Sequence, residues 1–187
     1  GKTTVFNLLT GIYKPDRGAI SLNINSVTTA LEGMKPHSIC KAGLARTFQN
    51  IRLFKDLTVL ENVIIAMHKD VEYGLTSGFL HLPSYKKEEK DLVRRGIELL
   101  KIFKLDDKKD ELANNLPYGE QRHLEIIRAL ATNPSILLLD EPAAGMNPAE
   151  TAELTKIIRW IRDDFKLTVL LIEHDMSVVM NICERIY

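Results

Sequence analysis

Hydrophobic residues recur at two kinds of spacing along the chain, and together these spacings predict an α/β fold. Recurrence every three to four residues favours amphipathic helices, whereas alternation or a short unbroken apolar run favours strands. The helical pattern occurs after Val5, from Pro36, from Thr58, over 97–105, over about 119–131 and within 147–165. Gly11 is a stop signal for the first of these helices.

Strand patterns lie near both ends of the chain. Ile20, Leu22 and Ile24 alternate with polar residues after a Pro-Asp-Arg-Gly turn, which predicts a half-buried strand. The stretch LARTFQN (44–50) suits a short strand that leads into a polar loop. The runs ILLLD (136–140) and LTVLLIEHD (167–175) begin as nearly continuous apolar stretches, which is typical of parallel strands covered on both faces.

Two helix starts carry capping signals. Thr58 and Glu61 stand three residues apart, as in a capping box. Asn147 is expected to cap a later helix, with Pro148 at its first position and Glu150 three residues after the cap. Since this later helix lies between the two apolar runs, we expect a right-handed crossover between parallel strands.

These patterns divide the chain into a core and an insertion. Residues 1–50 and 133–187 are expected to form an α/β core with a parallel sheet, and 51–132 a mostly helical insertion. Within the insertion, the segment near 71–84 is rich in Gly, Pro and Ser and predicts a loop, followed by an exposed helix.

Composition narrows the classes of function. The 25 Lys and Arg residues balance 25 Asp and Glu residues, so the general basic charge of a nucleic-acid-binding protein is missing, although a local basic patch stays open. No apolar run reaches the roughly 18 residues that a membrane-spanning helix needs. The two cysteines, Cys40 and Cys183, have no metal-ligand spacing.

The first four residues suggest a phosphate site. Gly1-Lys2-Thr3-Thr4 matches the end of the phosphate-loop pattern G-x-x-x-x-G-K-[ST], and a helix pattern follows it. A loop that leads into a helix start offers free N–H groups and the positive end of the helix dipole to an anion. Alone, these residues would also suit a solvated chain end, so the interpretation depends on the remaining sequence.

Titratable residues follow the two apolar strands. Asp140 and Glu141 stand at the carboxyl end of ILLLD, where open α/β sheets bind ligands. In a phosphate-loop enzyme the first acid would hold Mg²⁺, and the second would orient or deprotonate water. His174 would lie beside them if the two strands are neighbours. The alternatives are an acidic pair that ends a strand and a structural histidine.

Two further positions suit a nucleotide site. Gln49 has a neutral amide that could reach a metal and a water, although a plain loop amide would look the same. Gly119 stands at a helix start and could present free N–H groups to an anion, unless it is an ordinary helix start. A second phosphate-facing helix start is redundant in one monomer, so we expect it to face the nucleotide of another subunit.

In this order the motifs resemble the ATP-binding subunit of an ABC transporter, along essentially the whole chain. GKTT resembles the end of the Walker A loop, TFQN the Q-loop, LPYGEQ the signature, ILLLDEP Walker B, AAGMNP the D-loop and LIEHD the switch histidine. The resemblance implies a P-loop NTPase fold with a RecA-like ATP-binding core (1–50 and 133–187) and a helical signature subdomain (51–132). It also implies truncation at both ends, since the first loop glycine is missing and CERIY suits the start of another core strand.

The resemblance also implies ligands and residue roles. ATP and Mg²⁺ would be bound, with Lys2 on the β- and γ-phosphates and the backbone of Gly1, Thr3 and Thr4 around phosphate oxygens. The metal would be held by Thr3, Gln49 and Asp140; Glu141 would be the general base, His174 would contact the γ-phosphate, and Gln49 would report the metal's state to membrane subunits. Pro117, Gly119 and Glu120 would reach the ATP of a partner subunit.

The signature departs from the commoner pattern L-S-G-G-Q at two positions. Pro117 replaces a serine and cannot donate a hydrogen bond, which we interpret as a subfamily trait. Glu120 replaces a glutamine, and whether it points at the ligand or at Arg122 stays open. Around these motifs, stretches such as ARTFQNIRLFKDLTVLENV and LDEPAAGMNPAET look most like the branched-chain amino acid importers.

The function implied is therefore that of an importer ATPase. Two cassettes would sandwich two ATP molecules at the cytoplasmic face of the cell membrane, bound to membrane-spanning permease subunits and served indirectly by a solute-binding protein, with no nucleic-acid partner. One alternative is a soluble, non-transport ABC ATPase switch, which the lack of heptads disfavours. Another is a regulatory nucleotide-binding module with little turnover, which Glu141 and His174 disfavour.

Overall fold

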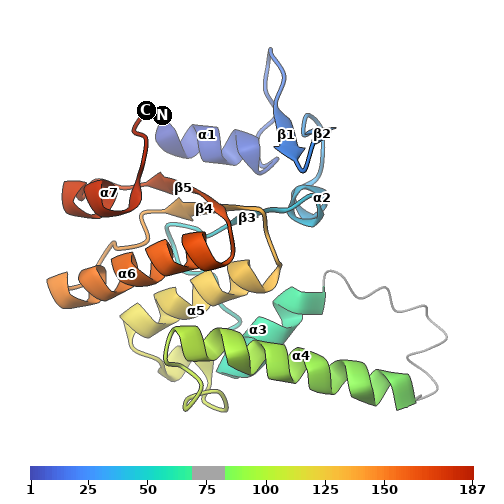
Figure 1. Ribbon diagram of the computed structural model, residues 1–187, viewed down its shortest axis with the longest axis vertical. Helices are drawn as coiled ribbons and strands as arrows, with labels where there is room; N and C mark the ends of the chain where they lie inside the picture. Colours follow the sequence, from blue (N-terminus) through green and yellow to red (C-terminus); the bar gives the residue numbers. More distant parts are fainter. Residues whose placement is uncertain (69–82) are drawn as a thin grey trace. The chain divides into compact units, whose positions relative to one another are not determined.

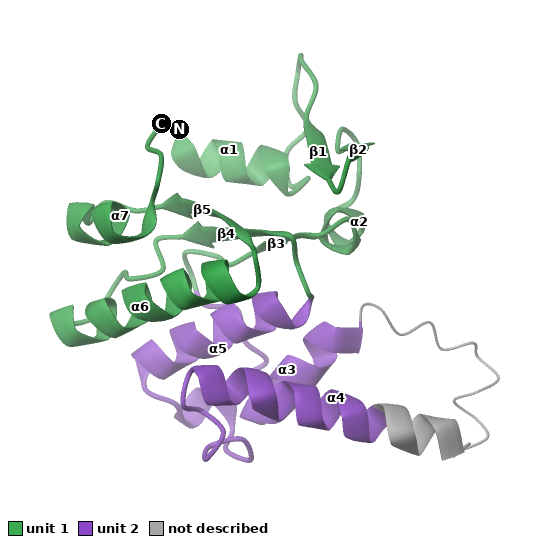
Figure 2. Ribbon diagram, in the orientation of Figure 1, with its two compact units in different colours: residues 1–50, 133–187 green, residues 51–132 purple. Residues whose placement is uncertain are grey.

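The computed structural model describes residues 1–68 and 83–187, with side chains described outside 83–88. The chain divides into two compact units, one formed by residues 1–50 with 133–187 and the other by residues 51–132 (Figure 2). These are the ranges expected for a core and an insertion. The loop expected near 71–84 lies outside the described residues as far as 82.

The first unit is built on a parallel sheet of three strands, in the order β3-β4-β5 (Figure 1). The strands are β3 (Leu44–Arg46), β4 (Ile136–Asp140) and β5 (Thr168–Ile172). β4 is the central strand, and its last four residues are buried, as the unbroken apolar run predicted. The helix α6 (Pro148–Asp164) connects β4 to its parallel neighbour β5, as expected for a crossover unit.

Further helices of this unit are α1 (Lys2–Leu9), α2 (Pro36–Lys41) and α7 (Met176–Ile182). The core joins residues from both ends of the chain: Phe6, Leu22, Leu31, Ile39, Leu44, Leu138 and Ile172. α7 was not predicted. It begins after Asp175, whose carboxylate accepts a hydrogen bond from the Ser177 N–H at 2.8 Å and so caps the helix.

A second strand beside the one predicted near Ile20 was missed. β1 (Ser21–Ile24) pairs with β2 (Val27–Ala30) in an antiparallel hairpin of its own. Asn25 and Ser26 connect them with φ angles of +50° and +66°. A two-residue turn with both φ angles positive twists in the same sense as its strands, which explains how so short a hairpin closes.

The expected strand at CERIY is not formed. Residues 183–187 have no regular secondary structure, and Tyr187 is fully exposed. A strand needs a neighbour to accept and donate its backbone hydrogen bonds. Among the described residues, nothing pairs with this segment.

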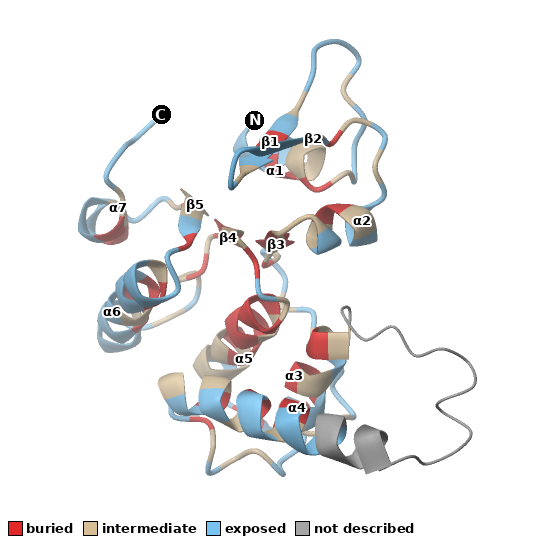
Figure 3. Ribbon diagram, turned by 45° about the vertical axis from the view of Figure 1, so that its right-hand side comes forward, coloured by how far each residue is buried: buried red, intermediate tan, exposed pale blue. Residues whose placement is uncertain are grey.

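The second unit is helical. Its helices are α3 (Val59–Met67), α4 (Pro83–Ile102) and α5 (Tyr118–Ala131), with a short 3-10 helix at Ala113–Asn115. The three long helices pack on one another, and α5 buries eight of its residues (Figure 3). The predicted capping box of α3 is present: the Glu61 N–H donates to Thr58 Oγ1 at 3.2 Å, and Glu61 Oε2 accepts from the Thr58 N–H at 2.7 Å.

The helix expected over 97–105 ends earlier, at Ile102. Lys104 adopts a left-handed φ of +55°, and the Leu105 N–H donates to the Leu100 carbonyl at 3.0 Å. Phe103 and Leu105 remain buried at 3% and 1% exposure, because the chain folds back onto the same apolar face. Apolar periodicity therefore continued past the helix that it predicted.

Among the helices that the structure describes, none combines the length and the apolarity needed to cross a bilayer.

Candidate functional site

Three predicted site residues meet in one hydrogen-bonded chain at the carboxyl edge of the parallel sheet. Glu141 Oε2 accepts a hydrogen bond from Gln49 Nε2 at 3.1 Å, and Glu141 Oε1 lies 2.9 Å from His174 Nε2. The register of β4 and β5 sets Asp140 opposite Ile172, so the residues that follow each strand come together. Gln49 follows β3 at the same edge, which the parallel pairing of β3 with β4 places beside Glu141.

The backbone of Glu141 is left-handed, with φ +47°. This conformation is uncommon for a residue with a side chain and is kept only where surrounding contacts require it. Here the Glu141 N–H donates to the Ile172 carbonyl at 2.9 Å, which continues the pairing of the sheet by one residue. The side chain retains 22% exposure, so its carboxylate is both oriented by two neighbours and open to water.

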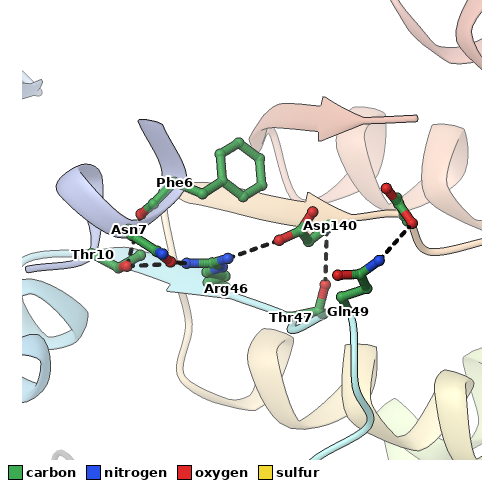
Figure 4. Close-up of polar contacts among 8 residues, drawn as sticks. Phe6, Asn7, Thr10, Arg46, Thr47, Gln49 and Asp140 are labelled. Carbon is green, nitrogen blue, oxygen red and sulfur yellow. Dashed lines mark hydrogen bonds and ion pairs between the residues drawn. The ribbon is translucent and has the colours of Figure 1, made fainter. Parts of the chain in front are cut away.

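Asp140, the residue before it, is engaged differently. Its Oδ2 atom accepts a charge-assisted hydrogen bond from Arg46 Nη2 at 2.7 Å, and the two side chains are only 3% and 5% exposed (Figure 4). The Asp140 N–H donates to Thr47 Oγ1 at 3.3 Å. Arg46 was not predicted as a site residue, although an arginine that directly follows the apolar strand residues Leu44 and Ala45 is a signal for a buried charged partner.

The Arg46 guanidinium also reaches the first helix. Nη1 donates to Asn7 Oδ1 on α1 at 2.6 Å and to Oγ1 of Thr10, the C-cap residue of α1, at 3.4 Å. The residues predicted to bind phosphate begin this same helix: Gly1 is its N-cap residue and Lys2 its first residue. One arginine side chain therefore connects Asp140 at the end of β4 to the helix that begins with the predicted phosphate-binding residues.

The predicted phosphate-binding residues are exposed at the start of α1. Lys2, Thr3 and Thr4 are all exposed, and no side chain caps the helix. The N–H groups of Thr4 and Val5 donate to the Gly1 carbonyl at 3.1 and 3.3 Å, so the helix leaves earlier N–H groups unpaired in its first turn. Such an end is electrostatically suited to an anion.

A metal site is not assembled by acidic and histidine side chains alone. Among residues 1–68 and 89–187, no group of three or more His, Cys, Asp or Glu side chains could hold a metal ion. The set predicted for Mg²⁺, Thr3, Gln49 and Asp140, contains only one such residue. It relies on a hydroxyl and an amide, which suit a hard cation that keeps several water ligands.

Glu173, beside the predicted histidine, was missed by the sequence analysis. Its Oε1 accepts from the Ala143 N–H at 3.0 Å, and its Oε2 accepts from the His174 N–H at 3.0 Å. The carboxylate thereby joins the AAGMNP segment to the backbone of the histidine loop. Within the same segment, Asn147 caps α6 as predicted, accepting from the N–H groups of Ala149 and Glu150.

The signature residues lie at the start of α5, in the second unit. Pro117 is the N-cap residue, so the helix begins at Tyr118, one residue earlier than expected. No side chain caps this end either, and Gly119 lies in its first turn. Glu120 does not pair with Arg122: both of its oxygens contact Lys108 Nζ, at 2.6 and 2.7 Å. The hydrogen bond that the Lys108 ammonium donates to this carboxylate raises the pKa of Lys108.

Arg122, the other possible partner of Glu120, is fully buried and pairs with Glu125 at 2.7 Å. Glu125 also accepts a hydrogen bond from the Arg52 N–H at 3.4 Å, and Arg128 donates to the Arg52 carbonyl. Two α5 side chains thus hold both backbone groups of one residue shortly after the Q-loop motif. This clamp was not predicted, because neither side chain carries a recognisable motif.

Comparison with known proteins identifies the same family that the motifs resemble. The sequence pattern of the ABC transporter family matches residues 1–144. The chain is 47% identical, over all 187 residues and 72% of the relative's length, to the high-affinity branched-chain amino acid transport ATP-binding protein LivG of Escherichia coli. It is 42% identical to the corresponding protein BraF of Pseudomonas aeruginosa, over 100% of this chain and 71% of that protein.

Solved structures give the same result for the fold. The ADP conformation of MJ1267, an ATP-binding cassette of an ABC transporter, superposes with a TM-score of 0.77 at 31% identity, covering 98% of this chain and 70% of that one. A nucleotide-free cassette of an ABC transporter superposes with a TM-score of 0.73, also at 31% identity and over the same shares of the two chains. The chain therefore belongs to the ABC transporter family, as one of its ATP-binding cassettes.

Proposed function

We propose that this chain is the ATP-hydrolysing subunit of an importer for branched-chain amino acids. The solute is suggested by the names of its relatives, which are branched-chain amino acid transport ATP-binding proteins. The hydrolytic activity is supported above all by one observation, the hydrogen-bonded chain of Gln49, Glu141 and His174 beside Asp140.

In this proposal Glu141 is the general base. Its partly exposed carboxylate can accept a proton from the water that attacks the γ-phosphate. The Gln49 amide and the His174 ring restrict its rotation, which keeps the oxygens aimed at one place. His174 is 65% exposed and could turn toward a phosphate once nucleotide is present.

Residues present on this chain fit Mg²⁺ and phosphate. Asp140 uses one oxygen for Arg46, and its Oδ1 has no hydrogen-bond partner within the described residues, which leaves an acceptor for a metal-bound water. Lys2 and Thr3 are exposed at an uncapped helix start. Asp140, Thr3 and Gln49 would hold the metal, which when bound neutralises charge on the β- and γ-phosphates.

The signature residues are proposed to serve a second cassette. Pro117, Gly119 and Glu120 begin an uncapped helix, so free backbone N–H groups are available there for the ATP of a partner subunit. Since Glu120 is held by Lys108, its charge is partly offset before any phosphate approaches. Permease subunits in the membrane and, indirectly, a solute-binding protein would complete an importer whose cassettes lie at the cytoplasmic face.

The test is transport by the complete importer in proteoliposomes, with radiolabelled leucine as solute and phosphate release measured in parallel. We expect uptake that requires Mg-ATP. Lys2→Ala should abolish uptake and weaken ATP binding, whereas Lys14→Ala, at another exposed lysine of the same unit, should leave both unchanged. Unchanged ATP affinity in Lys2→Ala would reject the phosphate-loop assignment. Phosphate release without leucine uptake would favour the non-transport ATPase.

A further inference from the structure

We propose that Arg46 is a positioning residue for ATP hydrolysis: it orients the Asp140 carboxylate toward the metal and ties it to the helix that begins with the phosphate-binding residues. The proposal rests on the proposed ATPase function of this site. It assigns a task to a side chain outside the motifs named above, since Arg46 precedes TFQN by one residue.

The contacts of Arg46 join three elements that are distant in sequence. From β3, its guanidinium reaches Asp140 at the end of β4 with Nη2 (2.7 Å) and Asn7 on α1 with Nη1 (2.6 Å) (Figure 4). Thr10, the C-cap residue of α1, accepts a longer hydrogen bond of 3.4 Å. The planar fork of an arginine can hold two partners at fixed directions, which a lysine ammonium cannot do as rigidly.

Aromatic rings fix the plane of this fork. The Arg46 guanidinium carbon lies 5.3 Å from the centre of the Phe6 ring and 5.0 Å from that of Phe48. Its Nε atom is buried without a hydrogen-bond partner in the described part of the chain. The side chain therefore has little freedom to turn away, and its hydrogen-bonding capacity is directed to the Nη atoms.

Burial makes the ion pair rigid. The Arg46 and Asp140 side chains are only 5% and 3% exposed. A buried carboxylate that loses its charged partner is strongly unfavourable, so the pair is not easily broken. The pair thus directs Asp140 Oδ2 at the Arg46 guanidinium, and Oδ1, the other oxygen of the carboxylate, points away from it. Because the Asp140 N–H is also held by Thr47, both backbone and side chain of the metal-proximal acid have fixed orientations.

The consequence is mechanical coupling within this unit. α1 begins with Lys2 and Thr3, and Arg46 contacts Asn7 in its second half and its C-cap residue Thr10. A displacement of the helix start relative to Asp140 would have to break or stretch these hydrogen bonds. Arg46 therefore keeps the phosphate-binding helix start and the metal-proximal acid in one geometry.

The test compares Arg46→Lys, Arg46→Met and Asn7→Ala with wild type in the complete importer. Arg159→Met, on the exposed side of α6, is the matched control. Measured for each are kcat of phosphate release, the Mg²⁺ concentration at half-maximal rate, ATP affinity in EDTA, and thermal unfolding. We expect Arg46→Met to raise the half-saturating Mg²⁺ concentration and to lower kcat, each by roughly 10-fold or more, as outer-shell substitutions commonly do.

ATP affinity in EDTA should stay near the wild-type value in Arg46→Met, because the proposed defect concerns the metal and not the phosphates. Asn7→Ala should show the same pattern more weakly, since it keeps the ion pair and loses only the shorter of the two hydrogen bonds between Arg46 and the α1 segment. Arg46→Lys should fall between Arg46→Met and wild type. The Arg159→Met control should match wild type in all four measurements.

A lower unfolding temperature with wild-type Mg²⁺ dependence and kcat would show that Arg46 is only structural and would overturn the proposal. If Arg46→Met fails to fold, Arg46→Lys and Asn7→Ala decide, and wild-type Mg²⁺ dependence in both would equally overturn it. Failure of the underlying function is distinguished by the wild-type protein, which would then release no phosphate at any Mg²⁺ concentration.

Discussion

Glu141 is the residue to which the proposed mechanism assigns the proton transfer. It has a left-handed backbone, and its two carboxylate oxygens contact side chains from two different loops, Gln49 and His174. These contacts are between side chains, whereas Glu141 extends the pairing of the sheet through its backbone N–H, so a substitution of the carboxylate leaves that backbone hydrogen bond in place. A substitution of Glu141 can therefore test the proton transfer separately from ATP binding.

Glu141→Gln should lower the rate of phosphate release by about 100-fold or more while leaving the ATP dissociation constant unchanged, because an amide of the same shape cannot accept the proton. Single-turnover hydrolysis and equilibrium ATP binding check the two parts separately. Glu89→Gln, at an exposed glutamate of α4, should behave as wild type. Wild-type turnover in Glu141→Gln would exclude this residue as the base.

Glu120 and Arg122 show why residue identity alone leaves charge partners undecided. Both are near the signature, and a pair between them was one of two possibilities from the sequence. In the structure Glu120 binds Lys108, twelve residues earlier, and Arg122 binds Glu125 in the helix interior. The choice depends on which face of α5 each side chain occupies and on what packs against that face.

At the scale of elements, the start of α3 illustrates a local device that sequence predicts well. The Glu61 carboxylate accepts hydrogen bonds from the Thr58 backbone N–H first and from its hydroxyl second, and these lower the pKa of Glu61. A carboxyl whose pKa is lowered on folding stabilises the folded state above its unfolded pKa. That contribution is lost as the pH falls through the folded-state pKa.

We therefore expect the capping box to lose its contribution in acid. Between pH 7 and a pH below about 4, wild type should lose more unfolding free energy than Glu61→Gln, which has no charge to titrate. Urea unfolding of both proteins at the two pH values measures the difference. Equal losses would mean that the Glu61 charge does not stabilise this helix start.

The packing of α4 on α3 depends on one small residue. A Cβ atom added to Gly96 would lie 3.0 Å from Leu60 Cδ1, tighter than ordinary van der Waals contact, with Val63 close behind. The two helices can approach this closely only because the glycine has no side chain.

Gly96→Leu should lower the unfolding free energy by about 1–3 kcal/mol, since the added side chain overpacks the helix contact. Arg95→Leu, at the neighbouring exposed position of the same helix, should change it by no more than about 0.5 kcal/mol. Urea titration with a common m-value gives both numbers. Wild-type stability in Gly96→Leu would indicate that α3 and α4 are not packed as described.

On the scale of the whole molecule, the chain leaves one unit at residue 50, forms the second, and returns at residue 133. Each unit has an uncapped helix start with a glycine in or before its first turn, Gly1 for α1 and Gly119 for α5. In the proposed sandwich of two cassettes, each ATP would lie between the start of α1 of one copy and the start of α5 of the other. Association should therefore require nucleotide that is bound and not hydrolysed.

Sedimentation of Glu141→Gln should shift from monomer to dimer on addition of Mg-ATP. The double variant Lys2→Ala with Glu141→Gln should stay monomeric under the same conditions, since it lacks the cation that pairs with the phosphates. A monomer in both cases would argue against a sandwich formed by this subunit without its membrane partners, and would favour a regulatory module or a requirement for those partners.

What the sequence by itself determined is local or ordered along the chain. The apolar periodicities predicted α1, α2, α3, α5 and α6 and the strands of the parallel sheet, because helix and strand geometry impose spacings that can be counted. Capping at Thr58 and Asn147 was predictable because both partners lie within three residues. The expectation that His174 lies beside Glu141 followed from the neighbouring strands that each residue follows.

Only the tertiary structure decided which distant groups meet. The hairpin of β1 and β2 was missed because its turn depends on positive φ angles at Asn25 and Ser26, which no periodicity records. The partner of Asp140 is Arg46, 94 residues away in sequence. Such contacts depend on which strands are neighbours and on which side chains are buried together. A buried charge needs an opposite charge nearby, and only the packing of distant segments determines which residue provides it.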